Sequence, residues 1–311
     1  MNRIEIKAFA KINLSLDVRQ KLENGFHEVE MVMQQILLND DVLVRWRKND
    51  AEPMVTIELR TNKYYLPTDE RNLAYKAAML MVAEFGGALY GNIRIDIKKR
   101  IPVAAGLAGG SSNAAAVLHG LNKLWELELS LQELCALGAK LGSDVPFCVM
   151  GQAAANDSIK EDFAGDPLAC HCALATGTGT TLTPIKGLRS HLVLSKPSIS
   201  VSTAAVYKGI DDEVIAARPD NDELIQALSE NQLKVVEKNM VNVLENFTLK
   251  RYPIVMYTKN KMQELCSSGC ALMSGSGPTV FGLCKNMNES KSICREMLNE
   301  NSESFWTRTT W

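Results

Sequence analysis

The clearest chemical feature of the chain is a glycine-rich segment at residues 102–113, with the sequence PVAAGLAGGSSN. Glycine lets backbone N–H groups approach an anion closely, and a helix that follows would point the positive end of its dipole at the same place. The segment therefore predicts a phosphate-binding loop. It is not a Walker A loop, because no lysine precedes Ser111, and it lacks the G-x-G-x-x-G pattern. A turn that only lets a helix pack closely on a sheet is the alternative.

A second glycine turn is formed by Gly275, Ser276 and Gly277, between apolar runs that predict strands at 271–273 and 279–283. Turns between strands often need glycine for its positive φ, so this turn alone is weak evidence for a ligand. Two glycine turns that both follow strands modestly strengthen the expectation that a nucleotide binds between them.

Three ionisable residues are candidates for catalysis or binding. Asp144 opens the apolar run 145–149, which predicts a strand, and its carboxylate is either a turn former or a base at the rim of a cleft. Lys11 lies in a predicted strand at 4–18 and is either solvated or functional. His27 follows a loop, where a histidine is more often a surface residue than a catalyst.

The composition limits the class of protein. Of 311 residues, 46% are hydrophobic and 23% charged, and the net charge is −2, which argues against a nucleic-acid-binding surface. No run is apolar enough for a membrane span, and the N-terminus does not resemble a signal peptide. The eight cysteines lie mostly in apolar stretches and predict buried, reduced thiols. We therefore expect a cytoplasmic protein without a nucleic-acid or membrane partner.

The hydrophobic patterning places these features on a mixture of strands and helices. Further strands are predicted at 31–38, 42–46, 55–59, 92–98 and 192–194, with a turn at 39–41. Helices are predicted after Asp69 up to the Gly86-Gly87 pair, from a cap at Ser111 or Ser112 onward, at 131–141, within 221–246 and at 259–267. Without regular β–α–β alternation, this order indicates an α+β protein.

Five stretches together resemble the GHMP kinases, the superfamily of galacto-, homoserine, mevalonate and phosphomevalonate kinases. The stretches are AKINL at 10–14, NGFH at 24–27, the segment 102–113, GSDVPF at 142–147 and SGSGP at 274–278. They occur in the family's order and span nearly the whole chain. AKINL and NGFH are similar to members whose acceptor carries a cytidine, in the non-mevalonate isoprenoid route.

The resemblance implies ATP-dependent phosphorylation of a hydroxyl group on a small-molecule substrate, with Mg²⁺ bound alongside ATP and no tightly bound prosthetic group. It implies that Asp144 is the general base and that Lys11 lies beside it and the acceptor hydroxyl. The implied ATP contacts are Lys99, Pro102, Val103, Ala104, Ala105, Gly106, Leu107, Ala108, Gly109, Gly110, Ser111, Ser112 and Asn113. The implied substrate contacts are Asn13, Phe26, His27, Tyr207, Gly275, Ser276 and Gly277. Ser111 and Ser112 are equally suited to lie near the metal.

The resemblance also implies a two-domain fold with the active site in the cleft between the domains, in a monomer or a homodimer. Residues 1–184 would form an N-terminal α+β domain like domain 2 of a ribosomal small-subunit protein, and residues 185–311 a ferredoxin-like domain. Another GHMP kinase of the homoserine or mevalonate type, and a catalytically silent nucleotide-binding sensor, are the alternatives. Phe26 and His27 disfavour the first, and the presence of Asp144 and Lys11 disfavours the second.

The chain departs from the family pattern in several places. Ala104, Ala105 and Ala108 stand where glycines are common, which predicts a stiffer loop. Phe26 replaces a more usual tyrosine. Residues 152–172 form an insertion, for which we expect either a mobile surface excursion near the cleft or a tolerated loop without function.

Overall fold

The computed structural model describes residues 2–23, 25–49, 54–87 and 90–311, and these form two compact units. The first unit consists of Met1–Ala10, Leu38–Ile101 and Ala108–Cys170. The second consists of Lys11–Leu37, Pro102–Leu107 and His171–Trp311. This division describes how the chain packs, and the domain boundary near residue 184 stays a prediction.

Two long strands supply residues to both units. Strand β1 (Arg3–Lys21) pairs with β2 (His27–Lys48), and the chain passes from one unit to the other within each strand. The predicted turn at 39–41 is wrong, because β2 continues through it. The buried Asp40 accepts hydrogen bonds from the backbone N–H groups of Arg100 and Ile101, at 2.7 and 2.9 Å. These tertiary partners satisfy a polar residue that otherwise favours a turn.

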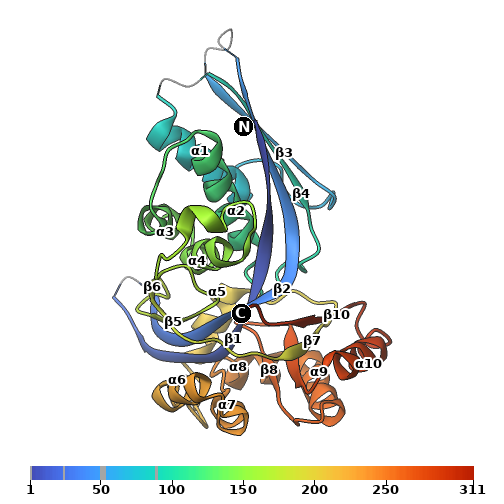
Figure 1. Ribbon diagram of the computed structural model, residues 1–311. Helices are drawn as coiled ribbons and strands as arrows, with labels where there is room; N and C mark the ends of the chain where they lie inside the picture. The colour runs from blue at the N-terminus through green and yellow to red at the C-terminus, as the bar shows by residue number, and fades with distance from the viewer. Residues whose placement is uncertain (1, 24, 50–53, 88–89) are drawn as a thin grey trace. The chain divides into compact units, whose positions relative to one another are not determined.

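In the first unit, helices pack on one face of a sheet (Figure 1). Strand β3 (Val55–Thr61) pairs in parallel with β4 (Gly91–Lys98), and β4 pairs antiparallel with the end of β2. The helices are α1 (Leu73–Phe85), α2 (Gly109–Leu124), α3 (Leu131–Ala139) and α4 (Val145–Ala155). Alternate strand residues such as Ile93 and Ile95 are fully buried under these helices, as the period of two predicts.

Two local predictions for this unit are wrong. Residues 145–149 begin helix α4 rather than a strand, since a short, continuously apolar run fits a buried helix as well as a buried strand. Helix α2 begins at Gly109, and its N-cap is Ala108 in the left-handed conformation rather than Ser111 or Ser112. The start of α2 is therefore set by the loop ahead of it and not by a hydroxyl cap.

Residues 152–170 belong to the first unit and pack on it through apolar side chains, and the expected mobility of the insertion stays a prediction. Helix α4 extends to Ala155, and a short 3-10 helix η1 (Lys160–Phe163) follows. The side chains of Ile159 and Phe163 are part of the hydrophobic core, while the acidic residues around them are exposed. Apolar side chains within the insertion thus pack it against the core.

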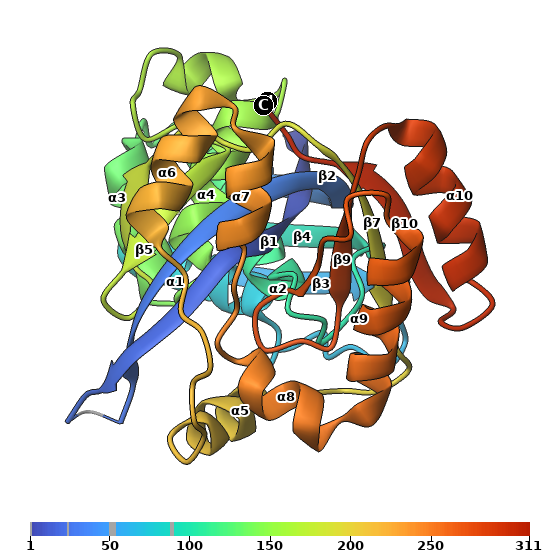
Figure 2. The same cartoon turned by 90° about the horizontal axis from the view of Figure 1, so that it is seen from below.

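The second unit contains a four-stranded antiparallel sheet with the order β10-β7-β9-β8. Its strands are β7 (His191–Lys196), β8 (Ala271–Met273), β9 (Val280–Cys284) and β10 (Glu303–Arg308). Helices α9 (Pro253–Leu265) and α10 (Met287–Met297) pack on it (Figure 2). This is the β-α-β-β-α-β order of a ferredoxin-like fold, elaborated by extra helices between β7 and α9.

The extra helices are α5 (Thr203–Ile210), α6 (Asn221–Glu230), α7 (Leu233–Asn239) and α8 (Glu245–Arg251). The unit also holds β5 (Cys172–Thr176), which pairs antiparallel with Met31–Gln34 of β2 and with β6 (Thr181–Pro184). Among the residues described, no helix is long and apolar enough to cross a membrane.

Candidate active site

The two glycine turns contact each other within the second unit. The Ser274 hydroxyl donates a hydrogen bond of 2.9 Å to the Gly106 carbonyl. A Cβ placed on Gly106 would lie 2.1 Å from the Ser274 carbonyl oxygen, and the φ of Gly106 is +73°. Only glycine fits there, because a side chain would meet both strain and backbone. The structure therefore brings residues 102–107 and 274–277 together, as the predicted nucleotide site requires.

Lys11 and Asn13 lie at the same place. The Lys11 backbone N–H donates to the Leu107 carbonyl at 3.2 Å, and the Lys11 ammonium donates to the Asn13 side-chain oxygen at 2.7 Å. A Cβ on Gly275 would lie 3.6 Å from that same Asn13 oxygen. Lys11 is buried at 4% exposure, so it is not a solvated strand residue. Burial of an ammonium requires hydrogen-bond partners, which favours the functional interpretation.

The second turn is held by side chains that the sequence did not single out. The buried Asn242 amide donates to the carbonyls of Met273 and Gly275, each at 2.8 Å. The Thr203 hydroxyl, at the start of α5, shares a hydrogen bond of 2.9 Å with the Ser276 hydroxyl. These two hydrogen bonds satisfy both carbonyls and restrict the conformation of the turn. A lone Asn within a helical pattern carries no signal of this role.

In the first unit, Lys99 lies in a buried cluster at the start of α2. Its ammonium is 2.5 Å from the Asp40 carboxylate and donates to the Asn113 side-chain oxygen at 3.2 Å. The Asn113 amide in turn donates to Asp40 at 2.8 Å. A Cβ on Gly109 would lie 3.0 Å from the Lys99 nitrogen, so the lack of a side chain at position 109 leaves room for the lysine. The sequence missed Asp40, which it treated as a turn residue.

The alanines of the loop adopt conformations that glycine usually occupies. Ala104 has a φ of +50° and Ala108 a φ of +55°. A left-handed conformation costs a residue with a side chain about 1–2 kcal/mol. The surrounding structure therefore holds these two residues in a conformation that alanine disfavours.

The other predicted ATP contacts differ in accessibility. Buried residues are Lys99, Pro102, Ala105, Leu107, Ser112 and Asn113; half-buried residues are Val103, Gly106, Ala108, Gly109 and Ser111; exposed residues are Ala104 and Gly110. The Ser112 hydroxyl donates to the Phe9 carbonyl at 2.7 Å, and the Gln152 amide donates to the Ser112 carbonyl at 2.8 Å. Ser112 is therefore engaged inside the first unit, which leaves Ser111 as the more accessible hydroxyl.

Asp144 is the N-cap residue of α4, yet its carboxylate makes no capping hydrogen bond to that helix. Its side chain is half-buried. Capping is the usual structural reason for an aspartate at this position. The capping role is therefore not observed, whereas the role of turn former fits the turn in which Asp144 lies. Asp144 belongs to the first unit and Lys11 to the second, and their joint action stays a prediction.

The predicted cytidine contacts lie in the second unit. The His27 ring, at the start of β2, is buried, and its centroid is 5.4 Å from that of Tyr207 in α5. Phe26 is 61% exposed, while Asn24 of the same stretch lies outside the described residues. The His27 Nε2 is 2.6 Å from the Asp211 carboxylate, and Lys21 is 2.7 Å from the other Asp211 oxygen. The sequence did not single out Asp211 or Lys21.

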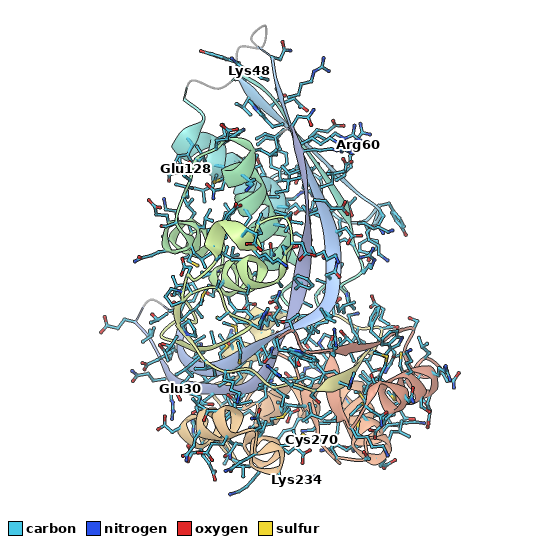
Figure 3. All side chains as sticks on the ribbon, in the orientation of Figure 1. Glu30, Lys48, Arg60, Glu128, Lys234 and Cys270 are labelled. Atoms are coloured by element: carbon cyan, nitrogen blue, oxygen red, sulfur yellow. The ribbon has the colours of Figure 1, made fainter. Side chains whose placement is uncertain are left out.

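A series of hydrogen-bonded polar side chains connects β1 with the start of α6 and with β2. The Ser15 hydroxyl donates to the Asn221 side-chain oxygen at 2.6 Å, and the Asn221 amide donates to Glu30, labelled in Figure 3, at 2.7 Å. Glu30 also lies 3.1 Å from Arg19. These contacts fix the start of α6 to β1 and β2.

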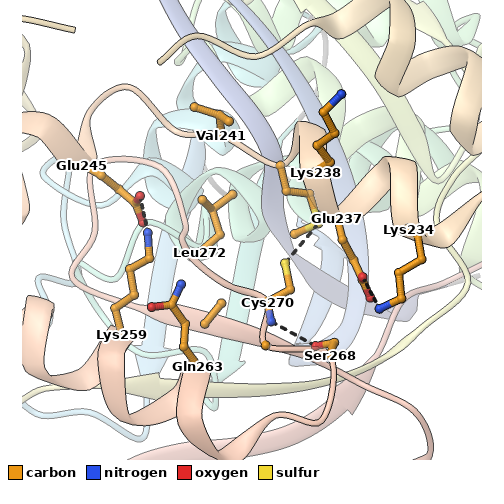
Figure 4. Close-up of a pocket in the computed structure, with 13 residues that line it drawn as sticks. Lys234, Glu237, Lys238, Val241, Glu245, Lys259, Gln263, Ser268, Cys270 and Leu272 are labelled. Carbon is orange, nitrogen blue, oxygen red and sulfur yellow. Dashed lines mark hydrogen bonds and ion pairs between the residues drawn. The ribbon is translucent and has the colours of Figure 1, made fainter. Parts of the chain in front are cut away.

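A pocket of about 450 Å³ in the second unit contains none of the predicted site residues (Figure 4). It is lined by Lys234, Glu237, Glu245, Lys259 and Cys270 among others. Its charges are largely paired, with Lys259 at 2.6 Å from Glu245 and Lys234 at 2.8 Å from Glu237. Burial raises the pKa of the Cys270 thiol to about 11, so the thiol is unreactive at neutral pH.

The described residues contain no group of three or more His, Cys, Asp or Glu side chains that could hold a metal ion. A magnesium ion that accompanies ATP needs few protein ligands, because phosphate oxygens and water fill most of its coordination sphere. The half-buried Ser111 hydroxyl is a hard oxygen donor and suits such an ion.

Models of known families match both halves of the chain. The model described as GHMP kinases N terminal domain matches residues 72–152, and the model described as GHMP kinases C terminal matches residues 214–303. The first match contains α2, with the predicted anion site at its start, and Asp144. The second contains β8, β9 and the helices α9 and α10 of the ferredoxin-like unit.

Curated relatives match over almost their whole length. A 4-diphosphocytidyl-2-C-methyl-D-erythritol kinase of Alkaliphilus metalliredigens is 48% identical over 293 residues, which cover 94% of this chain and 91% of the relative. The kinase of the same name from Clostridioides difficile is 42% identical over 307 residues, which cover 98% of this chain and 95% of the relative.

Solved structures agree. A crystal structure of 4-(cytidine 5'-diphospho)-2C-methyl-D-erythritol kinase has a TM-score of 0.77 and 28% identity, and the match covers 99% of this chain and 100% of that one. A homoserine kinase from Cytophaga hutchinsonii has a TM-score of 0.70 at 17% identity, covering 100% of this chain and 95% of that one. The second match shows a shared fold alone.

Proposed function

The chain belongs to the 4-diphosphocytidyl-2-C-methyl-D-erythritol kinase family of GHMP kinases, and from this we propose the reaction that it catalyses. It transfers the terminal phosphoryl group of ATP to the 2-hydroxyl of 4-diphosphocytidyl-2-C-methyl-D-erythritol, giving the 2-phosphate and ADP. The reaction is a step of non-mevalonate isoprenoid precursor biosynthesis. The observation that carries the proposal is the 48% identity to a kinase of this name over 94% of the chain.

Asp144 acts as the general base that accepts the proton of the acceptor hydroxyl. Its position at the start of α4, within the segment that matches the GHMP kinases N terminal domain model, supports this role. Lys11 stabilises the negative charge that develops on the acceptor oxygen, and its buried ammonium held by Asn13 supports that role. In phosphoryl transfer, positioning and charge neutralisation provide most of the acceleration. An ammonium group held in a fixed position therefore stabilises the transition state more than a mobile one.

ATP binds at residues 102–113, through backbone N–H groups that follow Pro102. The positive φ values at Ala104, Gly106 and Ala108 support this, because such conformations turn successive N–H groups toward one side. Lys99 remains paired with Asp40, and this ion pair contributes to ATP binding by fixing the start of α2. When bound, Mg²⁺ neutralises charge on the phosphates. Ser111 is the hydroxyl that would contact it.

Phe26, His27 and Tyr207 hold the cytidine, with stacking from the aromatic rings and hydrogen bonding from His27. The contact between the His27 and Tyr207 rings supports a shared site for these residues. Asn13 and the turn Gly275, Ser276 and Gly277 contact the rest of the substrate. The enzyme acts in the cytoplasm as a monomer or homodimer, without nucleic-acid or membrane partners.

A coupled assay of ADP release tests the function. The purified enzyme with MgATP is offered the cytidylylated methylerythritol, homoserine, mevalonate and galactose in parallel. We expect turnover with the first alone, and a loss of about 10²–10⁴-fold in kcat for Asp144→Asn. Asp157→Asn is the control, because its side chain is 90% exposed. Turnover with another acceptor alone would show that the protein is a GHMP kinase of another type. If ATP binds but none of the four acceptors is phosphorylated, the protein would instead be a nucleotide-binding sensor.

A further inference from the structure

The His27 ring is hydrogen-bonded to the end of helix α5. Its Nε2 is 2.6 Å from an oxygen of Asp211, the C-cap residue of α5, and its side chain is 6% exposed. The other oxygen of Asp211 accepts a hydrogen bond of 2.7 Å from Lys21 near the end of β1. All three residues belong to the second unit. The ring is thus held on one nitrogen by a carboxylate that is itself held by an ammonium.

This arrangement decides which ring nitrogen carries the proton. Hydrogen bonds from Lys21 and then from His27 hold the pKa of Asp211 below its ordinary value, so the carboxylate is ionised at neutral pH. An ionised carboxylate only accepts hydrogen bonds, and Nε2 must therefore donate. In the neutral ring, Nδ1 then carries no proton and is the acceptor.

We propose that Asp211, held by Lys21, is a positioning residue that fixes the His27 tautomer and thereby makes the site prefer cytosine to uracil. The proposal rests on the proposed function, in which His27 contacts the base. Cytosine carries an exocyclic amine, a hydrogen-bond donor, where uracil carries a carbonyl, an acceptor. An Nδ1 without a proton pairs with the amine, whereas it would face the carbonyl of uracil as acceptor against acceptor and leave both unsatisfied.

A purely structural role for these contacts makes different predictions. Lys21 and Asp211 would then only tie the end of β1 to the end of α5, and removing the carboxylate would lower stability without changing the tautomer or the choice of base. The tautomer and the base preference are therefore the readouts that separate the two roles.

The first test is the tautomer itself, which needs no substrate. The enzyme is labelled with ¹⁵N-histidine, and the His27 signals are identified among the four histidines by their loss in His27→Gln. We expect the Nε2–H tautomer in the wild type. In Asp211→Asn the Nδ1–H form should rise, because an amide can donate as well as accept. A wild-type ring with its proton on Nδ1 would overturn the proposal, whatever the enzyme phosphorylates.

The second test is kinetic and uses the substrate with cytidine and its analogue with uridine. For Asp211→Asn we expect KM for the cytidine compound to rise about tenfold with kcat nearly unchanged, and the kcat/KM preference for cytidine to fall by about the same factor. Asp211→Glu should recover part of the preference, because it keeps a carboxylate that only accepts hydrogen bonds.

Asp212→Asn is the matched control, because it removes the same charge one residue further on and the Asp212 side chain is exposed. It should leave KM, kcat and the base preference unchanged. An unchanged preference in Asp211→Asn, or an equal loss in Asp212→Asn, would contradict the proposal. If the folded wild type turned over neither compound, the proposed function would fail, and the ¹⁵N spectra would still decide the role of Asp211.

Discussion

Asp40 of β2 and Lys99, the residue after β4, form a buried ion pair with 2.5 Å between the carboxylate oxygen and the ammonium nitrogen. The Asp40 and Lys99 side chains are 0% and 5% exposed. The second oxygen of Asp40 accepts the backbone N–H groups of Arg100 and Ile101, the residues that lead into the glycine-rich loop. One carboxylate therefore fixes both the lysine and the entry to the loop.

Asp40→Asn should destabilise the protein by about 3 kcal/mol or more, because it leaves the buried Lys99 charge without a counter-charge. Urea unfolding measures the difference. The control is Asp41→Asn, whose carboxylate pairs with Arg100 near the surface and should contribute less than about 1 kcal/mol. The double variant Asp40→Asn/Lys99→Met should be more stable than Asp40→Asn, since it also removes the unpaired charge. Equal losses at positions 40 and 41 would contradict this account.

Gly106→Ala should disrupt the contact between the two glycine turns. The new Cβ would lie 2.1 Å from the Ser274 carbonyl oxygen, so a backbone segment must move. Gly269→Ala is a matched control, because its φ of +67° is similar and nothing lies within 4 Å of its Cβ. We expect a loss of about 1 kcal/mol at position 269 from backbone strain alone, and a distinctly larger loss at position 106. The two free energies of unfolding, together with KM for ATP, check this.

The stability of the protein should fall as the pH is lowered from about 6.5 to about 4. Burial lowers the pKa of His119 from 6.5 to about 4, so the unfolded chain binds a proton in this range that the folded protein does not. The lowered value favours the folded state above pH 6.5, and this advantage is lost as the pH falls. The difference corresponds to about 3 kcal/mol.

Urea titrations at pH 7 and pH 4.5 measure this effect. His119→Gln, which keeps a donor for the Val149 carbonyl, should show a smaller pH dependence than the wild type. The Nδ1 of His119 has no hydrogen-bond partner among the residues that the structure describes, as a buried neutral ring allows. An unchanged slope in the variant would show that other groups cause the acid sensitivity.

Phe163→Ala should destabilise the first unit by about 3 kcal/mol, because it removes a buried ring that packs edge-on against His119 with a centroid distance of 5.4 Å. Lys160→Ala, in the same short helix, should cost less than about 1 kcal/mol, since its ion pair with Asp157 is exposed. Hydrogen exchange should show slow amides around Phe163. Fast exchange throughout 152–172 would instead support a mobile insertion.

The strongly periodic elements could be predicted from the sequence. The helix α1 and the strands β3 and β4 follow directly from period and glycine signals, and the family stretches identified the fold. The prediction of a turn at 39–41 was wrong because the hydrogen-bond partners of Asp40 are about sixty positions away in the sequence, and no local pattern contains them. The prediction of a strand at 145–149 was wrong because a fully buried helix and a buried strand have the same apolar composition.

The candidate site was predictable to a similar extent. Lys11, Asn13 and the two glycine turns come together as expected, and His27 and Tyr207 are in contact. The residues that hold them were missed. Asp211 and Asn242 act through contacts with side chains or backbone groups that are distant in the sequence. Asp211 is followed by two further acidic residues and Asn242 lies in an apolar run, so no local pattern marks either residue.

Because β1 and β2 each contribute to both compact units, the gene cannot be divided into two self-sufficient halves. A fragment that begins at residue 185 would lack residues 11–37, 102–107 and 171–184, which complete the second unit. A single recombination event between two relatives would likewise exchange parts of both units rather than one intact unit. Selection must therefore act on the interleaved segments together, and a chimaera of two such kinases should fold only where the partners of β1 and β2 come from the same parent.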